Sequence, residues 1–175
     1  MKFTFNNTEK GFTLVELMVA SLVFSIIVLS ISGLFVQTLA QERRAFEAQK
    51  IQENGLFILE LMSREIRVSQ IQNQESTDCS ATSLTIIHPV NGTVTYTLNA
   101  GVLQRTAGGV TTDLSSSDVT FSRLNFCVLG SGVADKQQAR VTILASIQNK
   151  TGKEILTFNL ETGVSSRDES TEFAQ

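Results

Sequence analysis

Glu16 is the side chain in this sequence that most clearly needs a partner, because its carboxylate is charged and borders an apolar run. It stands directly before Leu17–Val36, twenty consecutive residues without a charge. An apolar helix of that length covers roughly 30 Å at about 1.5 Å per residue, which is the thickness of a bilayer's hydrocarbon core. A charge deep in a bilayer costs on the order of 3 kcal/mol unless it has a partner. The sequence therefore predicts a membrane-spanning helix and a partner for Glu16.

The run Gly11-Phe12-Thr13-Leu14-Val15-Glu16 resembles the processing site of type IV prepilins and type II secretion pseudopilins. The resemblance implies that a membrane-embedded prepilin peptidase cuts after Gly11 and N-methylates Phe12, the new first residue. It also implies that Glu16 pairs with the amine of Phe12 on a neighbouring subunit of a filament. Burial of this charge pair would then select for assembly.

An uncleaved signal anchor or a secretory signal peptide is the alternative for the same stretch. A secretory signal has an apolar core of roughly 7 to 15 residues followed by a small-residue cleavage site. Here the glycine precedes the apolar run, and the run is longer. Lys2 and Lys10 before the span are matched by Arg43 and Arg44 after it, so the positive-inside rule is a weak guide to orientation. Orientation follows from the family resemblance.

The chain of 175 residues has room for one domain beside its helix, and 42% hydrophobic and 18% charged residues are ordinary for a folded protein. Removal of the predicted leader, residues 1–11, takes away two lysines and one glutamate. It leaves 12 basic and 16 acidic side chains, a net charge of −4. The composition shows no basic footprint of the kind that nucleic-acid binding requires.

The helix is expected to continue through Gln37–Gln70, which lacks proline and is rich in good helix formers. Five apolar residues in it form one amphipathic stripe, which needs a cover: Ile51, Ile58, Leu59, Met62 and Ile66. Gly33 and Gly55 each cost about 1 kcal/mol relative to alanine, so bends or local melting are expected there.

The segment Gln52–Arg67 resembles the helix that follows the membrane span in minor pilins of the PilW type and in J-type pseudopilins. This resemblance implies a minor, low-copy subunit. The plain structural alternative is an amphipathic helix packed on a sheet, with Arg64, Glu65 and Arg67 on the solvent side.

From Ser83 onward, short runs rich in Val, Ile, Thr and Phe alternate with turn residues, which predicts hairpins and an antiparallel sheet. The expected strands are Ser83–His88, Thr93–Leu98, Val102–Thr106, Val119–Leu129, Ala139–Gln148 and Glu154–Glu161. An inward apolar face is expected at Val141, Ile143, Ala145 and Ile147, and also at Ile155, Phe158 and Leu160 after a shift in register. The fold class is therefore α+β, a long N-terminal helix packed on a C-terminal antiparallel sheet, as in pilins.

These patterns divide the chain into five predicted parts. They are a leader at 1–11, a transmembrane and filament-core helix at 12–40, an amphipathic soluble helix at 41–72, an antiparallel β domain at 73–164 and a loose polar tail at 165–175.

Cys79 and Cys127, the only cysteines, lie on the side that would be exported to an oxidising compartment, so a disulfide is predicted. It would close a loop of about fifty residues and contribute about 4 kcal/mol in the chain-entropy model. The alternative is two buried or unpaired thiols.

No catalytic or metal-binding constellation is visible, and no cofactor is expected. The single histidine, His88, stands beside a turn, and a zinc site would need several His or Cys ligands. Asp113, Asp118 and Asp135 lack the dense alternation of oxygen ligands of a calcium loop.

The leading interpretation is therefore a minor pilin or pseudopilin, not an enzyme, that initiates or caps a filament. Its expected partners are the prepilin peptidase, other pilins or pseudopilins, the inner-membrane assembly platform and membrane lipid. The precursor would be a single-pass protein of the cytoplasmic membrane with its C-terminal domain outside the cytoplasm. A type IV pilus, a secretion pseudopilus and a DNA-uptake pilus share these motifs. The alternative is a membrane-anchored binding module outside any filament, and an exported enzyme ranks third.

Overall fold

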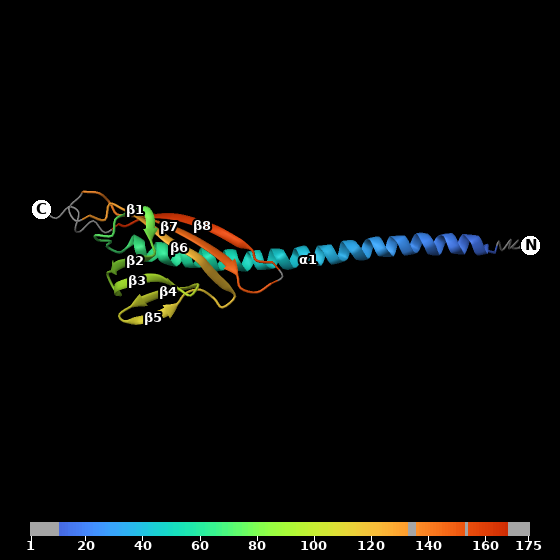
Figure 1. The fold of residues 1–175 in the computed structure, drawn as a ribbon, viewed down its shortest axis with the longest axis horizontal. Helices are drawn as coiled ribbons and strands as arrows, with labels where there is room; N and C mark the ends of the chain where they lie inside the picture. Colours follow the sequence, from blue (N-terminus) through green and yellow to red (C-terminus); the bar gives the residue numbers. More distant parts are fainter. Residues whose placement is uncertain (1–10, 133–135, 153, 168–175) are drawn as a thin grey trace, which may run out of the picture. The chain divides into compact units, whose positions relative to one another are not determined.

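The computed structural model describes residues 11–132, 136–152 and 154–167 (Figure 1). Its elements are α1 (Leu14–Arg67), β1 (Ser76–Ala81), β2 (Ser83–His88), β3 (Gly92–Asn99), β4 (Val102–Ala107), β5 (Val110–Asp113), β6 (Val119–Leu129), β7 (Arg140–Asn149) and β8 (Thr157–Ser165). The contacts divide the chain into two compact units at Arg44 and Ala45, and α1 contributes to both. Each unit is described by itself.

The first unit holds the apolar half of α1. Its large hydrophobic side chains are exposed from Phe12 to Leu39. Five hydroxyl groups in this stretch bond back to main-chain carbonyls of the preceding turn, those of Ser21, Ser25, Ser30, Ser32 and Thr38. Such bonds satisfy a hydroxyl inside the helix and leave an outer surface that lipid can solvate.

The second unit packs the other half of α1 against two antiparallel four-stranded sheets. Sheet A has the strand order β2-β3-β4-β5, and sheet B has the order β1-β6-β7-β8. One long helix with antiparallel sheets confirms the predicted α+β, pilin-like class. The strands form two sheets, however, where one was predicted. Alternation along one strand shows which side chains face a core, and it does not show which strands are neighbours.

The predicted helix stripe forms the centre of the core. All five of its residues, Ile51, Ile58, Leu59, Met62 and Ile66, are buried. From sheet B they meet Val141, Ile143, Ala145 and Ile147, which are buried as the alternation predicts. Sheet A contributes Leu84, Ile86, Val94, Tyr96 and Leu103 to the same cluster. Burial of these side chains on one helix face adds tertiary stabilisation to the intrinsic helix propensity of this stretch.

The local melting predicted at the two glycines of α1 is not observed: the helix is unbroken from Leu14 to Arg67. Gly55 is buried, and a Cβ built there would lie 2.5 Å from Cδ1 of Leu160 on β8. The residue therefore lets helix and strand approach closely. The helix ends at Arg67, three residues before the predicted end at Gln70.

The structure corrects the prediction for Ile155, adds two strands that were not predicted, and changes part of the predicted tail. Ile155 does not face inward: it is 72% exposed and precedes β8, which begins at Thr157. The short polar strands β1 and β5 were not predicted, because Ser76–Ala81 and Val110–Asp113 lack an apolar alternation. Of the predicted tail, Ser166 is buried and donates its hydroxyl proton to the Ser69 carbonyl at 2.6 Å, while residues 168–175 lie outside the described residues.

Candidate processing and assembly site

The predicted processing site lies immediately before the first turn of α1. Gly11, Phe12 and Thr13 belong to no helix or strand, Phe12 is 84% exposed, and a Cβ built on Gly11 would meet nothing within 4 Å. The bond between Gly11 and Phe12 thus lies in irregular, accessible chain, where a peptidase can reach it. The rest of the predicted leader, residues 1–10, lies outside the described residues.

Thr13 and Glu16 also have a local role in folding. The amide of Glu16 donates to Oγ1 of Thr13 at 3.3 Å, and the amide of Leu17 donates to the Thr13 carbonyl at 3.2 Å. Thr13 is therefore the N-cap, and Glu16 stands at the third helical position, as in a capping box. A carboxylate there also interacts favourably with the positive end of the helix dipole. The motif that resembles a processing site is, at the same time, a helix start signal.

The carboxylate of Glu16 forms no ion pair with any side chain that the structure describes. It stands at the start of a helix that is long and apolar enough to cross a membrane by length and composition. The structure brings Gly11, Phe12 and Glu16 together within about one turn. It places no catalytic side chain beside them among the described residues.

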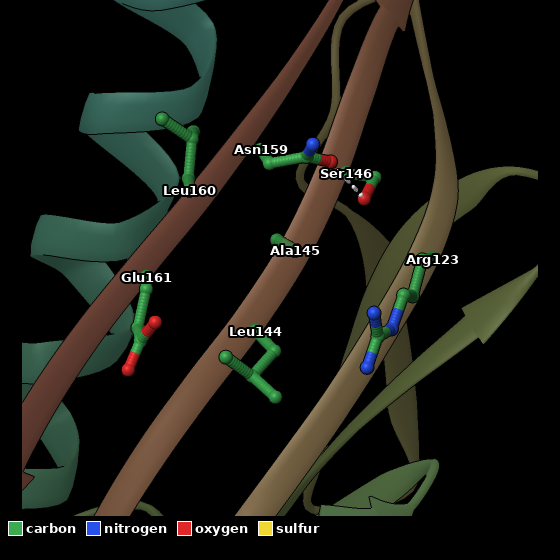
Figure 2. A pocket seen from close by; sticks show the side chains of 7 residues that line it. All are labelled: Arg123, Leu144, Ala145, Ser146, Asn159, Leu160 and Glu161. Atoms are coloured by element: carbon green, nitrogen blue, oxygen red, sulfur yellow. Dashed lines mark hydrogen bonds between the residues drawn. The ribbon is translucent and has the colours of Figure 1, made fainter.

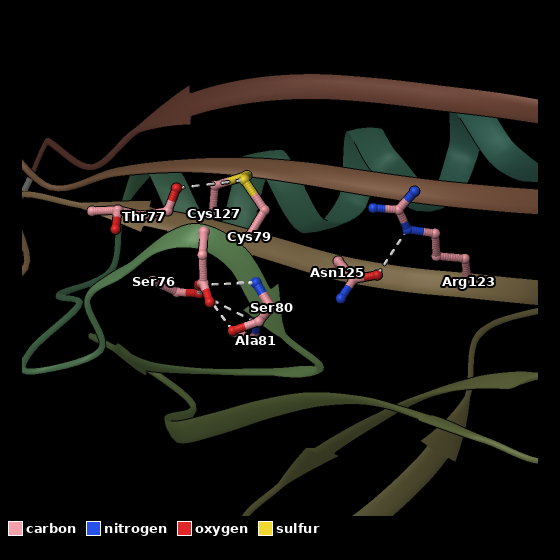
Figure 3. Close-up of a disulfide and its surroundings, with 9 residues drawn as sticks. Ser76, Thr77, Cys79, Ser80, Ala81, Arg123, Asn125 and Cys127 are labelled. Atoms are coloured by element: carbon pink, nitrogen blue, oxygen red, sulfur yellow. Dashed lines mark hydrogen bonds between the residues drawn. A yellow bond between two sulfur atoms is a disulfide. The ribbon is translucent and has the colours of Figure 1, made fainter.

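Cys79 and Cys127 are joined by a disulfide in the structure (Figure 3). Ser76 pairs with Val128 and Ala81 with Phe126, so four residues of β1 bulge out opposite Cys127 alone. Cys79 lies within this bulge at a positive φ of 57°. The disulfide therefore attaches an irregular edge strand to the centre of sheet B.

Asp78 organises the bulge through its Oδ1 atom, which accepts bonds from the Ser80 hydroxyl at 2.9 Å and from the Ser80 amide and the Ser76 hydroxyl at 3.2 Å each. The hydrogen bonds from Ser80 hold the pKa of the Asp78 carboxyl below its usual value.

A cluster of Glu65, Tyr96 and Arg105 attaches α1 to sheet A. Glu65 accepts two bonds from Arg105, from Nε at 3.0 Å and from Nη2 at 2.8 Å, and a third from the Tyr96 hydroxyl. The Glu65 and Arg105 side chains are only 17% and 19% exposed. The expectation that Glu65 faces solvent is therefore wrong, whereas Arg64 and Arg67 are exposed as expected.

The pKa values of this cluster follow from burial and pairing. Burial raises the pKa of Glu65, but the bonds from Arg105 and Tyr96 outweigh it, so the pKa lies below its usual value. Burial and the bond to Glu65 raise the pKa of Tyr96, and the bond to Glu65 raises the pKa of Arg105. One signal for this cluster was present in the sequence. By strand alternation Arg105 shares the inward face with Leu103, and an inward charge requires a partner.

The remaining polar candidates have local roles. Nδ1 of His88 accepts bonds from the amides of Val90 and Asn91 at 3.1 Å each, so His88 is a turn residue. Asp113 accepts a bond from Gln104 at 2.8 Å, Asp118 lies at the turn before β6, and Asp135 lies outside the described residues. Within residues 11–132, 136–152 and 154–167 no three His, Cys, Asp or Glu side chains gather as metal ligands would.

A shallow hollow lies on the outer face of sheet B (Figure 2). It is lined by Arg123 of β6, Leu144 and Ser146 of β7, and Asn159 and Glu161 of β8, with Ala145 and Leu160 behind them. Ser146 donates to Oδ1 of Asn159 at 2.6 Å, and Arg123 donates to Asn125 at 2.9 Å. The hollow contains no pair of a nucleophile and a base.

Comparison with known families matches residues 6–32 to the prokaryotic N-terminal methylation motif. The match covers the exposed bond after Gly11, the N-cap at Thr13, Glu16 and most of the apolar run. The N-terminal part of the chain thus carries a prepilin-type methylation motif, followed by a helix long and apolar enough to anchor it in a membrane. Neither the curated proteins nor the solved structures contain a match to it.

Proposed function

We propose that this chain is a minor pilin or pseudopilin, a structural subunit that initiates or caps a type IV pilus or a type II secretion pseudopilus. The prepilin peptidase cuts the single-pass precursor after Gly11 and methylates the amine of Phe12. The C-terminal domain lies outside the cytoplasm. The helix of the mature subunit then moves from the membrane into the filament.

One observation carries this proposal: within a methylation motif, a carboxylate without an ionic partner among the described residues stands at the start of the exposed apolar half of α1. An anchor that stays in lipid offers this carboxylate no ionic partner, and an unpartnered charge in a bilayer is costly. A filament supplies a use, because the methylated amine of Phe12 on a neighbouring subunit is the cation that Glu16 lacks. The resemblance of Gln52–Arg67 to PilW-type and J-type subunits supports a minor role.

Prepilin peptidase dependence tests the proposal. The full chain is produced in cells with and without a prepilin peptidase, and the N-terminus of the membrane fraction is read by mass spectrometry. We expect N-methyl-Phe12 only with the peptidase. Gly11→Val should leave uncleaved precursor, because a branched side chain obstructs the scissile position.

Gly33→Val is the matched control, since a Cβ at Gly33 also meets nothing within 4 Å and the residue lies well inside the helix. It should be cleaved like the unaltered chain. A leader that stays on the unaltered chain in the presence of the peptidase would identify the protein as a plain membrane-anchored module.

A further inference from the structure

Strand β8 forms an open edge of sheet B. It pairs with β7 over nine residues without a register shift and has no neighbour on its other side among the described residues. The Asn149 amide donates to the Leu156 carbonyl, and the Ser166 amide donates to the Ala139 carbonyl. These two pairs of opposite residues are therefore of the hydrogen-bonded kind in an antiparallel ladder. Because hydrogen-bonded pairs alternate along an antiparallel ladder, the main-chain groups of every second residue of β8 point away from β7. These residues are Thr157, Asn159, Glu161, Gly163 and Ser165.

No described residue bonds to the main-chain groups on this edge. The edge of β2 is different. There the main chain of Ile87 exchanges bonds with Gln70, and the main chain of Thr85 exchanges bonds with the side-chain amide of Gln74. On the far edge of sheet B, β1 is bulged and held by the disulfide, and the other edge of sheet A, β5, has four residues.

Proteins commonly protect an edge strand with lysine, proline, a bulge or a cover. β8 contains no lysine or proline and no bulge, and the described residues supply no cover. It is the one long, regular edge that the described part of the chain leaves unprotected. Its free N–H and C=O groups are ready to pair with an extended chain.

The core beside β8 is also incomplete. The inward-facing Phe158 and Leu160 remain half-buried, whereas their partners on β7, Ile147 and Ala145, are buried. One more strand would cover the open flank of these two side chains. On the outer face Asn159 and Glu161 stand exposed at the rim of the hollow (Figure 2).

We propose that β8 binds an extended segment of another protein as a further strand of sheet B. The segment places apolar side chains beside Phe158 and Leu160, and a basic side chain beside Glu161, the only charged residue of β8. A second copy of this chain fits less well, since β8 carries no cation that could pair with the Glu161 of another β8. The proposal does not depend on filament assembly.

The test uses the full chain in detergent and a labelled, acetylated nine-residue peptide, Thr-Val-Thr-Val-Lys-Val-Thr-Val-Thr. We expect saturable binding by fluorescence anisotropy and slower hydrogen exchange at Asn159, Glu161 and Gly163. The same peptide with alternate backbone amides methylated should not bind. Glu161→Pro removes an edge N–H without removing a bond to β7, and should weaken binding at least about tenfold.

Glu161→Thr is the matched control, because it removes the charge and keeps the N–H in a good strand former; it should weaken binding only a few-fold. Equal affinity for Glu161→Pro and the unaltered chain, with equal melting temperatures, would overturn the proposal. A dimer in ultracentrifugation that Glu161→Pro abolishes would also overturn the proposal, because the occupant of the edge would then be a second copy of this chain. Peptide binding that appears only after removal of residues 168–175 would overturn it as well, because the occupant would then be the chain's own C-terminal end. If Glu161→Pro does not fold, the methylated peptide decides, and its binding to the unaltered chain would overturn the proposal.

Discussion

The carboxylate of Glu16 has two roles, and they can be separated by substitution. It stands at the positive end of the helix dipole, three residues after the N-cap Thr13, and it lacks a cation among the described residues. In a single subunit the group can stay at the headgroups, so insertion and cleavage should survive its loss. In a filament, removal of one member of a buried charge pair typically costs about 3 to 5 kcal/mol.

We therefore expect Glu16→Ala to give mature, N-methylated, membrane-located protein that fails to co-purify with other pilins. Thr13→Ala is the control, because it removes the cap, at a cost of about 1 kcal/mol to the helix start, and keeps the carboxylate. Pull-down from detergent extracts measures both. Equal recovery of partners with Glu16→Ala and with the unaltered chain would show that charge pairing does not recruit this subunit.

The Glu65 cluster predicts a defined dependence of stability on pH. The pKa of Glu65 is lower in the folded than in the unfolded chain, where it is about 4.3. The carboxylate therefore contributes stability above about pH 4.3, and this contribution is lost as the pH falls through the folded-state pKa. At neutral pH, Glu65→Gln should reduce the free energy of unfolding by about 2 kcal/mol, since it strands the Arg105 charge in a mostly buried site.

Chemical denaturation at pH 7 and at pH 3 measures this effect, with Glu60→Gln as the control. Glu60 forms only an exposed ion pair with Arg64 at 3.6 Å, so its loss should cost less than about 0.5 kcal/mol. A Glu65→Gln deficit that is as large at pH 3 as at pH 7 would contradict the assignment.

At the scale of elements, β1 depends on its disulfide. The strand pairs with β6 at two separated points around a four-residue bulge, and no described strand pairs with its other edge. We predict that the exported protein carries the Cys79–Cys127 bond, so that both thiols resist alkylation in denatured protein until a reductant is added. The cysteines are 48 residues apart, and loss of the bond should cost about 4 kcal/mol in the chain-entropy model.

Double replacement by serine, with thermal unfolding followed by circular dichroism, measures this cost. Hydrogen exchange should rise first in β1 and at the adjoining edge of β6. Two freely labelled thiols in the unreduced, denatured protein would refute the bond.

The helix shows what periodicity can and cannot predict. The stripe from Ile51 to Ile66 and the alternation from Val141 to Ile147 depend on local spacing, and both face the core as predicted. The prediction of a bend or local melting at Gly55 was wrong. Intrinsic helix propensity includes the cost of glycine, but it does not include the close contact with Leu160 that requires a residue without a side chain. The prediction that Ile155 faces inward was wrong because β8 begins at Thr157, two residues later than the apolar pattern suggests. Element type was predictable, and boundaries and close contacts were not.

At the scale of the whole molecule, the candidate site was more predictable than the tertiary arrangement. Gly11, Phe12 and Glu16 form a contiguous motif, so their proximity follows from the chain itself. The Glu65 cluster joins residues up to 40 positions apart, and the division into two sheets depends on which strands pair. Such long-range choices leave only indirect signals in one sequence, such as the inward charge of Arg105.

The turn between β3 and β4 joins the two sheets and leads to a last prediction. The Gly101 carbonyl accepts a bond from the Phe121 amide at 2.8 Å and another from the Thr120 hydroxyl at 3.3 Å, both at the start of β6. Gly101 has a φ of +80°, and a Cβ there would lie 2.2 Å from Oγ1 of Thr120. Gly101→Ala must therefore strain the backbone and displace the Thr120 hydroxyl that bonds to this turn.

We expect Gly101→Ala to reduce the free energy of unfolding by about 3 kcal/mol, from about 1 kcal/mol of left-handed strain and the rest from the displaced junction. Gly92→Ala isolates the strain, because Gly92 has a φ of +67° and open space around its Cβ position; it should cost only about 1 kcal/mol. Urea denaturation of both variants measures the difference. Equal losses would mean that the junction at Thr120 and Phe121 does not hold sheet A to sheet B, whereas a larger loss at Gly101 assigns the excess to that junction.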